Sequence, residues 1–198
     1  MGFRRKPGAA AGLMLIMSYT LISARQRFQT TIRQYGRQYG GSKMTTTRQG
    51  GCACGAVRYV FEGDPLFTHA CHCTDCQRLT GSAFGISMII EERQLRGTKG
   101  RPMSGELIAD SGNRKKVYFC GACGSTLWNK LSGRPGAIAL KPGTLDENDW
   151  FKPEAHIWTR SKQPWVKIPE DTASYETAYD TLEVWPKESL ERLQAKSD

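Results

Sequence analysis

The sequence predicts a mainly β fold with little helix, and the pattern of apolar residues is the main reason. From residue 50 onward, short runs rich in Val, Ile, Tyr, Phe and Trp alternate with Gly, Pro and Asp turns, at a spacing typical of antiparallel strands. The length of 198 residues and the hydrophobic fraction of 39% suit one domain with a substantial core. No apolar run is long enough to span a bilayer, so a membrane segment is not expected.

Six strands and one helix follow from this pattern. The charged residues around Leu190 and Leu193 leave a narrow apolar stripe, which predicts a helix over Lys187–Lys196. The sequence has no internal repeat of solenoid length, no low-complexity tract after residue 46 and no clear boundary of a second domain. The expected strands are Ala56–Glu62, Ala83–Ile90, Lys115–Phe119, Ser125–Asn129, Ala137–Leu140 and Ala155–Thr159.

The seven cysteines fall into three short clusters, and none is left over. Zinc takes four ligands in structural sites, and three protein ligands plus an open position in catalytic sites, so seven divides into four and three. Two pairs that are far apart in the sequence are typical of one ribbon-type site, which would tie a hairpin's turn to the entrance of an earlier strand. These pairs are Cys52 with Cys54 and Cys120 with Cys123, and the remaining cluster is Cys71, Cys73 and Cys76, whose fourth position would face water or substrate.

Three other interpretations of the cysteines stay open at this point. Disulfides would leave one thiol unpaired, because the count is odd, and a CxC bridge closes a strained ring. The middle cluster would be purely structural if His72 or His69 closed it as a fourth ligand. An iron–sulfur cluster normally uses four cysteines, so the middle cluster fits it less well.

The net charge of +9 belongs to the beginning of the chain. Residues 1–43 hold eight Lys or Arg and no acidic residue, which leaves 20 basic against 19 acidic residues from Met44 onward. The part expected to fold is therefore nearly neutral. Nucleic acid is not an expected partner unless the basic leader is expressed.

The basic leader, residues 1–43, has three interpretations. A basic start before the apolar run Ala9–Met17 is compatible with a targeting segment. A disordered basic arm would use Tyr35 and Tyr39 to stack on bases. We favour the third interpretation, a misassigned start codon with Met44 as the first residue. Zinc-bound thiolates suit a reducing compartment, so a cytoplasmic location is expected, with an organellar or exported protein as the alternative if the leader is a targeting segment.

Four ordered motifs resemble the family of the glutathione-dependent formaldehyde-activating enzyme, which also contains centromere protein V. They extend from about Gly50 to about Glu170 and read GGCACGAVRY, HACHCTDCQRLTGSAF, FCGACGSTLW and HIWTRSKQPW. The resemblance implies that residues 44–198 form a single zinc-binding β domain, a zinc-stapled antiparallel β-sandwich of the β-tent type. It implies structural zinc at Cys52, Cys54, Cys120 and Cys123, and a reactive zinc at Cys71, Cys73 and Cys76.

The resemblance also implies a chemistry for the open site. A zinc-bound thiol is deprotonated at neutral pH, so a substrate thiol such as that of glutathione would enter the fourth position as a thiolate. Three cysteinate ligands leave the site negative, which favours nucleophilic sulfur chemistry over water activation. The implied reaction joins glutathione, as co-substrate, to formaldehyde, and its reverse breaks a carbon–sulfur bond. We therefore expect a carbon–sulfur lyase with two zinc ions per chain.

Substrate contacts are expected close to the reactive cluster. Gln77, Arg78 and Ser82 follow Cys76 directly and are the predicted contacts of the thiol substrate, although Arg78 equally fits a solvated surface charge. A different class of function remains, a non-catalytic zinc-stabilised binding module for a protein or a polyanion. The sequence leaves open the physiological thiol and electrophile and the oligomeric state.

Histidines and tryptophans near the motifs have mainly structural interpretations. His72 lies between two cysteines, so its ring is expected to point away from the ion and to pack against the core. His156 belongs to an expected core strand and would be satisfied there or line the cleft. Trp158 and Trp165 would cover the site or belong to the core.

Overall fold

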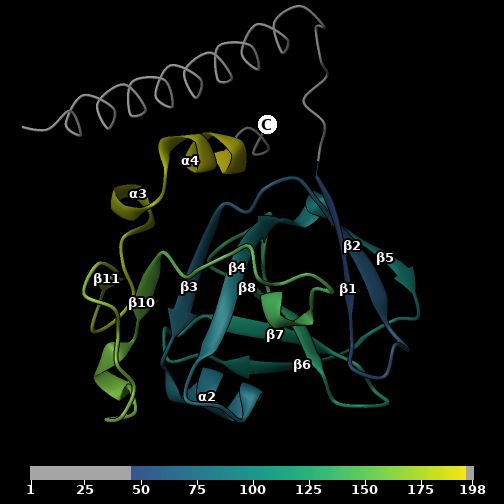
Figure 1. Ribbon diagram of the computed structural model, residues 1–198, viewed down its shortest axis with the longest axis horizontal. Helices are drawn as coiled ribbons and strands as arrows, with labels where there is room; N and C mark the ends of the chain where they lie inside the picture. Colours follow the sequence, from purple (N-terminus) through teal and green to yellow (C-terminus); the bar gives the residue numbers. More distant parts are fainter. Residues whose placement is uncertain (1–45, 195–198) are drawn as a thin grey trace, which may run out of the picture. The chain divides into compact units, whose positions relative to one another are not determined.

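The computed structural model describes residues 46–194, and these residues form eleven strands and few helices (Figure 1). The predictions for residues 1–43 therefore lie outside the described residues. The strands are β1 (Thr47–Gly51), β2 (Arg58–Glu62), β3 (Phe67–Cys71), β4 (Gly85–Glu91), β5 (Leu95–Lys99), β6 (Met103–Ile108), β7 (Arg114–Phe119), β8 (Thr126–Leu131), β9 (Ala137–Leu140), β10 (Ala155–Ile157) and β11 (Ala173–Ser174). The α-helices are α2 (Thr74–Thr80), α3 (Thr181–Val184) and α4 (Lys187–Gln194).

The strands form two sheets. The small sheet has the order β1-β2-β5, and the large sheet has the order β11-β10-β3-β4-β9-β8-β7-β6. All pairs are antiparallel except those of β10, which runs parallel to both β3 and β11. The predicted mainly β fold is confirmed, with parallel pairing at one edge as a difference from the expected antiparallel sandwich. β10 lies next to the edge strand β11 and follows a long connection after β9, so its direction is not set by a hairpin.

The main core lies between the two sheets. Successive side chains of a strand point to opposite faces, so the even-numbered residues of β4 share one face. Met88 and Ile90 pack there against Tyr59 and Phe61 of β2 in the small sheet. Leu127 of β8 completes this layer, and all five side chains are at most 1% exposed. The alternation of β4 therefore assigns its odd-numbered residues to the other face of the large sheet.

The C-terminal segment covers that other face. Phe67 of β3 and Ile89 of β4 form a second apolar cluster with Trp185, which follows α3. The Trp185 ring stacks on Phe67 at 5.8 Å between ring centroids. Residues of α4, including Leu190 and Leu193, pack against the same cluster, and Figure 1 shows α3 and α4 on the side of the large sheet away from β1 and β2. None of the described helices has the length and hydropathy needed to cross a membrane.

Six of the eleven strands and α4 lie where the sequence predicts them, with ends shifted by a few residues. Five strands were not predicted: β1, β3, β5, β6 and β11. Of these, β5 and β6 are largely exposed and carry few apolar residues, so they lack the pattern on which the prediction depends. The prediction of a single helix was also wrong, since α2 forms a helix around Cys76.

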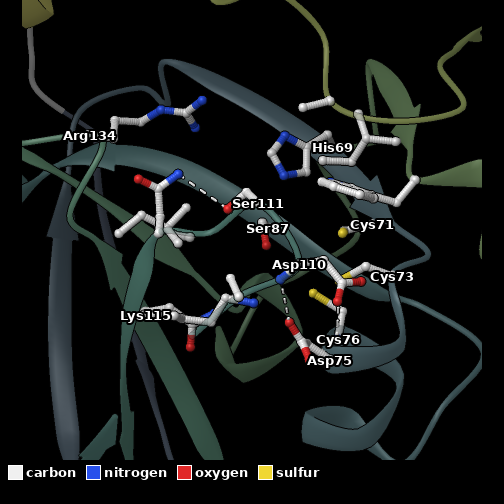
Figure 2. Close-up of a pocket in the computed structure, with 18 of the residues that line it drawn as sticks. His69, Cys71, Cys73, Asp75, Cys76, Ser87, Asp110, Ser111, Lys115 and Arg134 are labelled. Carbon is white, nitrogen blue, oxygen red and sulfur yellow. Dashed lines mark hydrogen bonds between the residues drawn. The ribbon is translucent and has the colours of Figure 1, made fainter. Parts of the chain in front are cut away.

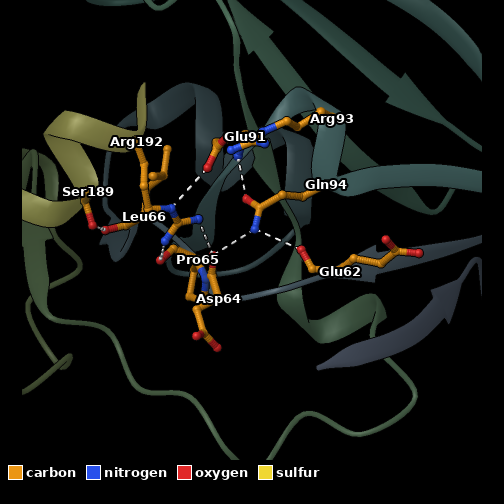
Figure 3. A network of polar contacts seen from close by, with 9 residues as sticks. All are labelled: Glu62, Asp64, Pro65, Leu66, Glu91, Arg93, Gln94, Ser189 and Arg192. Carbon is orange, nitrogen blue, oxygen red and sulfur yellow. Dashed lines mark hydrogen bonds and ion pairs between the residues drawn. The ribbon is translucent and has the colours of Figure 1, made fainter. Parts of the chain in front are cut away.

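An ion-pair network around the buried carboxylate of Glu91 fixes α4 to the domain (Figure 3). The Glu91 side chain is 1% exposed, and Arg192 Nε donates to its Oε1 at 3.0 Å while Arg93 pairs with Oε2. Burial would raise the pKa of Glu91, but hydrogen bonds from Arg93 and Arg192 outweigh it and lower the pKa. Arg192 Nη2 also donates to Asp64 O at 2.8 Å, and Ser189 Oγ donates to Leu66 O at 2.7 Å. Residues far apart in the sequence are thus joined at one point.

We expect Arg192→Ala to lower the free energy of unfolding by about 2–3 kcal/mol in urea titrations. The change leaves Glu91 buried with less compensation and removes the bond to the Asp64 carbonyl. Because the pKa of Glu91 is lowered in the folded state, the stabilisation from its ion pairs is present at neutral pH and is lost as the pH falls. The control is Lys187→Ala, which removes only an exposed pair with Glu191 and should change stability by less than about 0.5 kcal/mol. Equal effects of the two changes would contradict the proposed role of the network.

Candidate metal centres and their cavity

The two outer cysteine pairs meet in one group. The ligand atoms of Cys52, Cys54, Cys120 and Cys123 all lie within 4.8 Å of one another. Cys52 and Cys54 precede β2, and the other pair lies in the turn of the β7–β8 hairpin, as the expected strand positions predict. The Sγ–Sγ distances of 3.5 Å for Cys52–Cys54 and 3.8 Å for Cys54–Cys120 fit four sulfurs around one tetrahedral zinc, for which Zn–S bonds of about 2.3 Å give about 3.8 Å.

Hydrogen bonds in this group favour thiolates at Cys52 and Cys123. Val57 N donates to Cys52 Sγ at 3.2 Å and lowers the pKa of Cys52. Ser125 lowers the pKa of Cys123 to about 5. A backbone hydrogen bond at Ala56 lowers the pKa of Cys54, but the sulfurs of Cys123 and Cys52 outweigh it and raise the pKa to about 11. The raised pKa of Cys54 reflects repulsion between neighbouring thiolates. A divalent cation would relieve this repulsion, so the donor set fits zinc.

The middle cysteines form a second group at the junction of β3 and α2. Cys71 ends β3, Cys73 is the N-cap of α2, and Cys76 lies in the first turn of that helix. Their three sulfurs lie within 4.8 Å of one another, and all three residues are buried. Cys76 N donates to Cys73 Sγ at 3.4 Å, so the helix start itself orients this thiol. The local geometry presents three thiols to one point.

The charges of this group again fit a cation. Hydrogen bonds with Cys71 and Cys73 lower the pKa of Cys76 to about 2, while the pKa of Cys71 is raised for the converse reason. One sulfur thus ionises readily only while its neighbours keep their protons. All seven cysteines lie in the described part of the chain, so neither group has a further cysteine to recruit. The three thiols form an incomplete ligand set for zinc.

Two buried lysines near this cluster were missed in the sequence analysis. Lys115 of β7 is 6% exposed and Lys141, which follows β9, is 7% exposed. A Cβ atom placed on Gly85 would lie 3.4 Å from Cys76 Cβ and 3.7 Å from Lys141 Nζ, so Lys141 approaches Cys76 across a residue without a side chain. Burial lowers the pKa of Lys141, and the negative charge of Cys76 opposes that shift. The lysines supply positive charge where zinc with three cysteinates would leave a net negative charge.

We expect Lys141→Met to weaken zinc binding at the middle cluster about tenfold at pH 7. Protonated thiols carry no charge, whereas zinc with three cysteinates carries one negative charge, so a nearby ammonium group favours the zinc-bound state. Competition with a chromophoric chelator measures the affinity. The matched control is Lys116→Met, which changes the next residue of β7 beside Lys115 and on the other face of the strand. Unchanged affinity in Lys141→Met would contradict this electrostatic role.

The three cysteines line one part of a cavity of about 170 Å³. This cavity lies on the face of the large sheet that the C-terminal segment covers. Odd-numbered residues of β3, β4, β7 and β8 line it, including His69, Ser87, Lys115 and Asn129. The cysteines and His69 lie on one side of the cavity, and Lys115 and Arg134 lie on the opposite side (Figure 2). The cavity therefore combines a thiol cluster with fixed positive charge.

Two polar features of this cavity concern ligand recognition. Asn129 is 3% exposed, and its Oδ1 has no hydrogen-bond partner among the described residues. A buried acceptor of this kind is costly unless a ligand or water supplies a donor. At the rim, the carboxylates of Asp75 and Asp110 each have an oxygen within 4.8 Å of Cys73 Sγ. Asp110 N donates to Asp75 Oδ2 at 3.1 Å, which links the β6–β7 turn to the start of α2.

The predicted substrate contacts Gln77, Arg78 and Ser82 do not line this cavity. Gln77 Nε2 donates to the carbonyls of His72 and Ser161, at 2.7 and 2.9 Å, so its side chain ties two loops together. Arg78 and Ser82 are exposed. The cavity lining instead comes from strands distant in the sequence, and proximity to Cys76 along the chain did not indicate it.

The histidines differ in what they contact. His72 is fully buried, and its Nε2 lies 2.8 Å from Nδ1 of His156, so it packs in the core as expected. His156 does not line the cavity, whereas His69 does. His69 Nδ1 is hydrogen-bonded to the Tyr179 hydroxyl at 2.8 Å, and burial lowers the pKa of His69 to about 3. Neither His69 nor His72 joins the cysteine group as a fourth ligand within the described residues.

The two tryptophans that were expected to cover the site have separate positions. Trp158 lines the cavity, and its φ of 57° is in the left-handed region that a residue with a side chain rarely adopts. Its backbone N–H donates to Thr177 O at 3.0 Å, which helps to hold this conformation. Trp165 is 72% exposed and does not line the cavity.

The comparison with protein-family models agrees with the motifs. Residues 47–161 match the family model described as glutathione-dependent formaldehyde-activating enzyme. No curated protein gave a significant match. Among solved structures, a crystal structure of a Rhodobacter sphaeroides protein, a structural genomics target, is similar with 21% identity and a TM-score of 0.41. That match covers 53% of this chain and 91% of the other.

Proposed function

Because the chain belongs to the glutathione-dependent formaldehyde-activating enzyme family, we propose that it catalyses the reversible addition of a glutathione-like thiol to formaldehyde. The forward reaction gives S-hydroxymethylglutathione, and the reverse reaction is that of a carbon–sulfur lyase. We assign the reaction to the cavity beside Cys71, Cys73 and Cys76, with a reactive zinc at these residues. The cluster of Cys52, Cys54, Cys120 and Cys123 would hold a second, structural zinc.

The observation that carries this proposal is an incomplete set of metal ligands at the wall of a cavity. Three buried thiols converge there, and neither a fourth cysteine nor a histidine completes the group among the described residues. A closed structural site uses four protein ligands, whereas an open site keeps one position for substrate. The four-cysteine cluster provides the contrast within the same chain, since its ligand set is complete without the cavity.

The proposed reaction needs an activated sulfur and a nearby carbonyl. A zinc ion bound by the three cysteines would supply the positive charge that lowers the pKa of a substrate thiol. The sulfur–carbon bond forms while the π bond of formaldehyde breaks, and the electron pair moves to the carbonyl oxygen. The thiol loses one proton and the oxygen gains one, so the addition needs no oxidant or reductant. Lys115 and Lys141 favour the negative charge of the assembled site.

The polar groups of the cavity suit a peptide thiol. Lys115 and Arg134 provide positive charge for a carboxylate, and Asn129 Oδ1 offers an unused acceptor for an N–H group. Glutathione carries both kinds of group near its sulfur. The volume of about 170 Å³ is below the roughly 300–1,000 Å³ of pockets that enclose larger ligands, so the cavity would enclose only part of the peptide thiol together with the aldehyde.

Exchange NMR on the full chain tests this function. With glutathione and formaldehyde present, the exchange rate between free glutathione and its hydroxymethyl adduct should rise in proportion to protein concentration. The comparison thiol is 2-mercaptoethanol, which lacks carboxylate and amide groups. The protein should accelerate the exchange between this thiol and its hydroxymethyl adduct much less. Exchange at the rate of buffer alone would defeat the proposal and favour a zinc-stabilised binding module.

A further inference from the structure

Part of the cavity wall comes from residues beyond the family match. The match ends at residue 161, but Ala178 and Tyr179 line the cavity together with the cysteines. The segment that carries them is fixed to the sheet: β11 pairs with β10, and Tyr175 N donates to His156 O at 2.9 Å. The C-terminal segment is therefore built into the candidate site of this chain.

Tyr179 connects this segment to His69 through hydrogen bonds and ring contacts. Its hydroxyl lies 2.8 Å from His69 Nδ1, and Trp185 Nε1 donates to the same hydroxyl at 3.0 Å. The Tyr179 ring packs edge-on against both Phe67 and His69, with centroid distances of 5.4 and 5.7 Å. These contacts leave the His69 ring little freedom to turn.

The donors around Tyr179 determine which nitrogen of His69 carries the proton. An indole N–H can only donate, so the Tyr179 oxygen accepts from Trp185. The described hydrogen bonds of this hydroxyl are to Trp185 and His69, whereas the Arg134 guanidinium donates to Thr181 Oγ1 at 3.2 Å. Among the described residues, His69 Nδ1 is therefore the acceptor for the phenolic proton. A neutral imidazole that accepts at Nδ1 carries its proton at Nε2.

His69 is well placed for the aldehyde. It lies two residues before Cys71 on β3, so both side chains point to the same face, and its partner across the ladder is Ser87, which also lines the cavity. The hydrogen bond of the His69 ring is made by Nδ1, and among the described residues none is bonded to Nε2. Figure 2 shows the imidazole beside Cys71 at the end of the cavity that holds the cysteines.

We propose that His69 is a catalytic residue that donates a hydrogen bond from Nε2 to the aldehyde oxygen, and that Tyr179 is the positioning residue that fixes its tautomer. This inference rests on the proposed function. As the sulfur–carbon bond forms, negative charge develops on the oxygen, and a preoriented N–H stabilises it. The oxygen gains the proton that the thiol loses, so the addition balances, and His69 stays neutral and keeps its Nε2 proton throughout. In the lyase direction, the same bond holds the oxygen as the carbon–sulfur bond breaks.

The tautomer can be measured without turnover. Full-length protein labelled with ¹⁵N-histidine contains three histidines, and His69→Gln identifies the signals of residue 69. We expect a proton on Nε2 in the wild type and a mixture of tautomers in Tyr179→Phe. The matched control is Tyr175→Phe, since the Tyr175 ring packs against Tyr179 at 5.6 Å but its hydroxyl has no partner among the described residues. A wild-type proton on Nδ1 would overturn the proposal.

Exchange kinetics test the catalytic role of His69 and the positioning role of Tyr179. Tyr179→Phe should lower kcat about tenfold with KM for glutathione within twofold, and Tyr175→Phe should leave both unchanged. His69→Leu should lower kcat about 100-fold, whereas His69→Gln, which keeps an N–H donor, should recover part of the loss. The double change His69→Leu with Tyr179→Phe should be no worse than His69→Leu alone.

The outcomes separate the two proposals. If the wild type accelerates exchange and His69→Leu does so equally well, this inference is wrong and the proposed function stands. Additive losses in the double variant would likewise reject Tyr179 as a positioning residue for His69. If the wild type gives no acceleration, the proposed function fails, and the catalytic assignment of His69 fails with it.

Discussion

Cys76→Ser is expected to remove one of two zinc ions per chain and to lower the exchange rate between glutathione and its hydroxymethyl adduct at least 100-fold. Cys76 is the one cysteine of the middle cluster within α2, and its sulfur approaches both Cys71 and Cys73. A serine oxygen is a poor replacement for a thiolate toward zinc, which prefers sulfur and nitrogen donors. Without the ion, a substrate thiol would lose the positive charge that favours its thiolate.

Metal analysis and exchange NMR on the same sample measure both effects. The fold should persist, because the main core lies between the two sheets and does not include Cys76. The matched control is Arg78→Ala on the same helix: it is exposed and does not line the cavity, so zinc content, kcat and KM for glutathione should be unchanged. A raised KM in Arg78→Ala would support its predicted role as a substrate contact. Loss of both ions in Cys76→Ser would mean that the two sites are not separable.

The cysteine grouping could be predicted from sequence because chelation imposes short spacings. Cys120 and Cys123 must reach one ion from a single hairpin turn, and a CxxC spacing is sufficient for that. Cys52 and Cys54 form the other pair, since two pairs far apart in the sequence are typical of one ribbon-type site. The structure brings these sulfurs together, and their occupation by zinc stays a prediction.

The elements that carry the middle cluster were harder to predict. The β3 sequence, FTHAC, is completely buried, but its histidine and cysteine interrupt the apolar pattern expected of a strand. The α2 sequence, TDCQRLT, is seven residues long and buries only Cys76, so it has no amphipathic period to detect. Both segments are specified by the site that they form rather than by a local pattern.

The cavity lining depends on strand register, which the sequence does not specify. Lys115, Asn129 and Ser87 come from three strands and meet because each lies on the same face of the large sheet. A lysine in a strand is normally expected at the surface, and the burial of Lys115 becomes understandable only when the cysteine cluster opposite is known. The sequence prediction therefore identified the thiols and missed the charges that complement them.

Cys120→Ser is expected to have the larger effect on stability, lowering Tm by about 10 °C or more with loss of the other zinc ion. Cys120 is 1% exposed, directly follows β7, and belongs to the core cluster between the sheets together with Leu127 and Cys52. Zinc at this cluster would join the residues before β2 to the β7–β8 turn, and a connection between distant segments stabilises the folded state strongly. Calorimetry with parallel metal analysis measures both quantities.

Comparison with Cys123→Ser separates the metal from the packing of the thiol. Cys123 belongs to the same four-cysteine cluster but is exposed. The described hydrogen bond of its sulfur is to Ser125 Oγ. Its replacement should cost little in packing, so a similar fall in Tm for both variants would assign the stabilisation to zinc. A chelator should then lower the Tm of the wild type to the same level. A large effect of Cys120→Ser alone, with zinc retained, would instead assign the stabilisation to the buried side chain and contradict the metal-dependent fold.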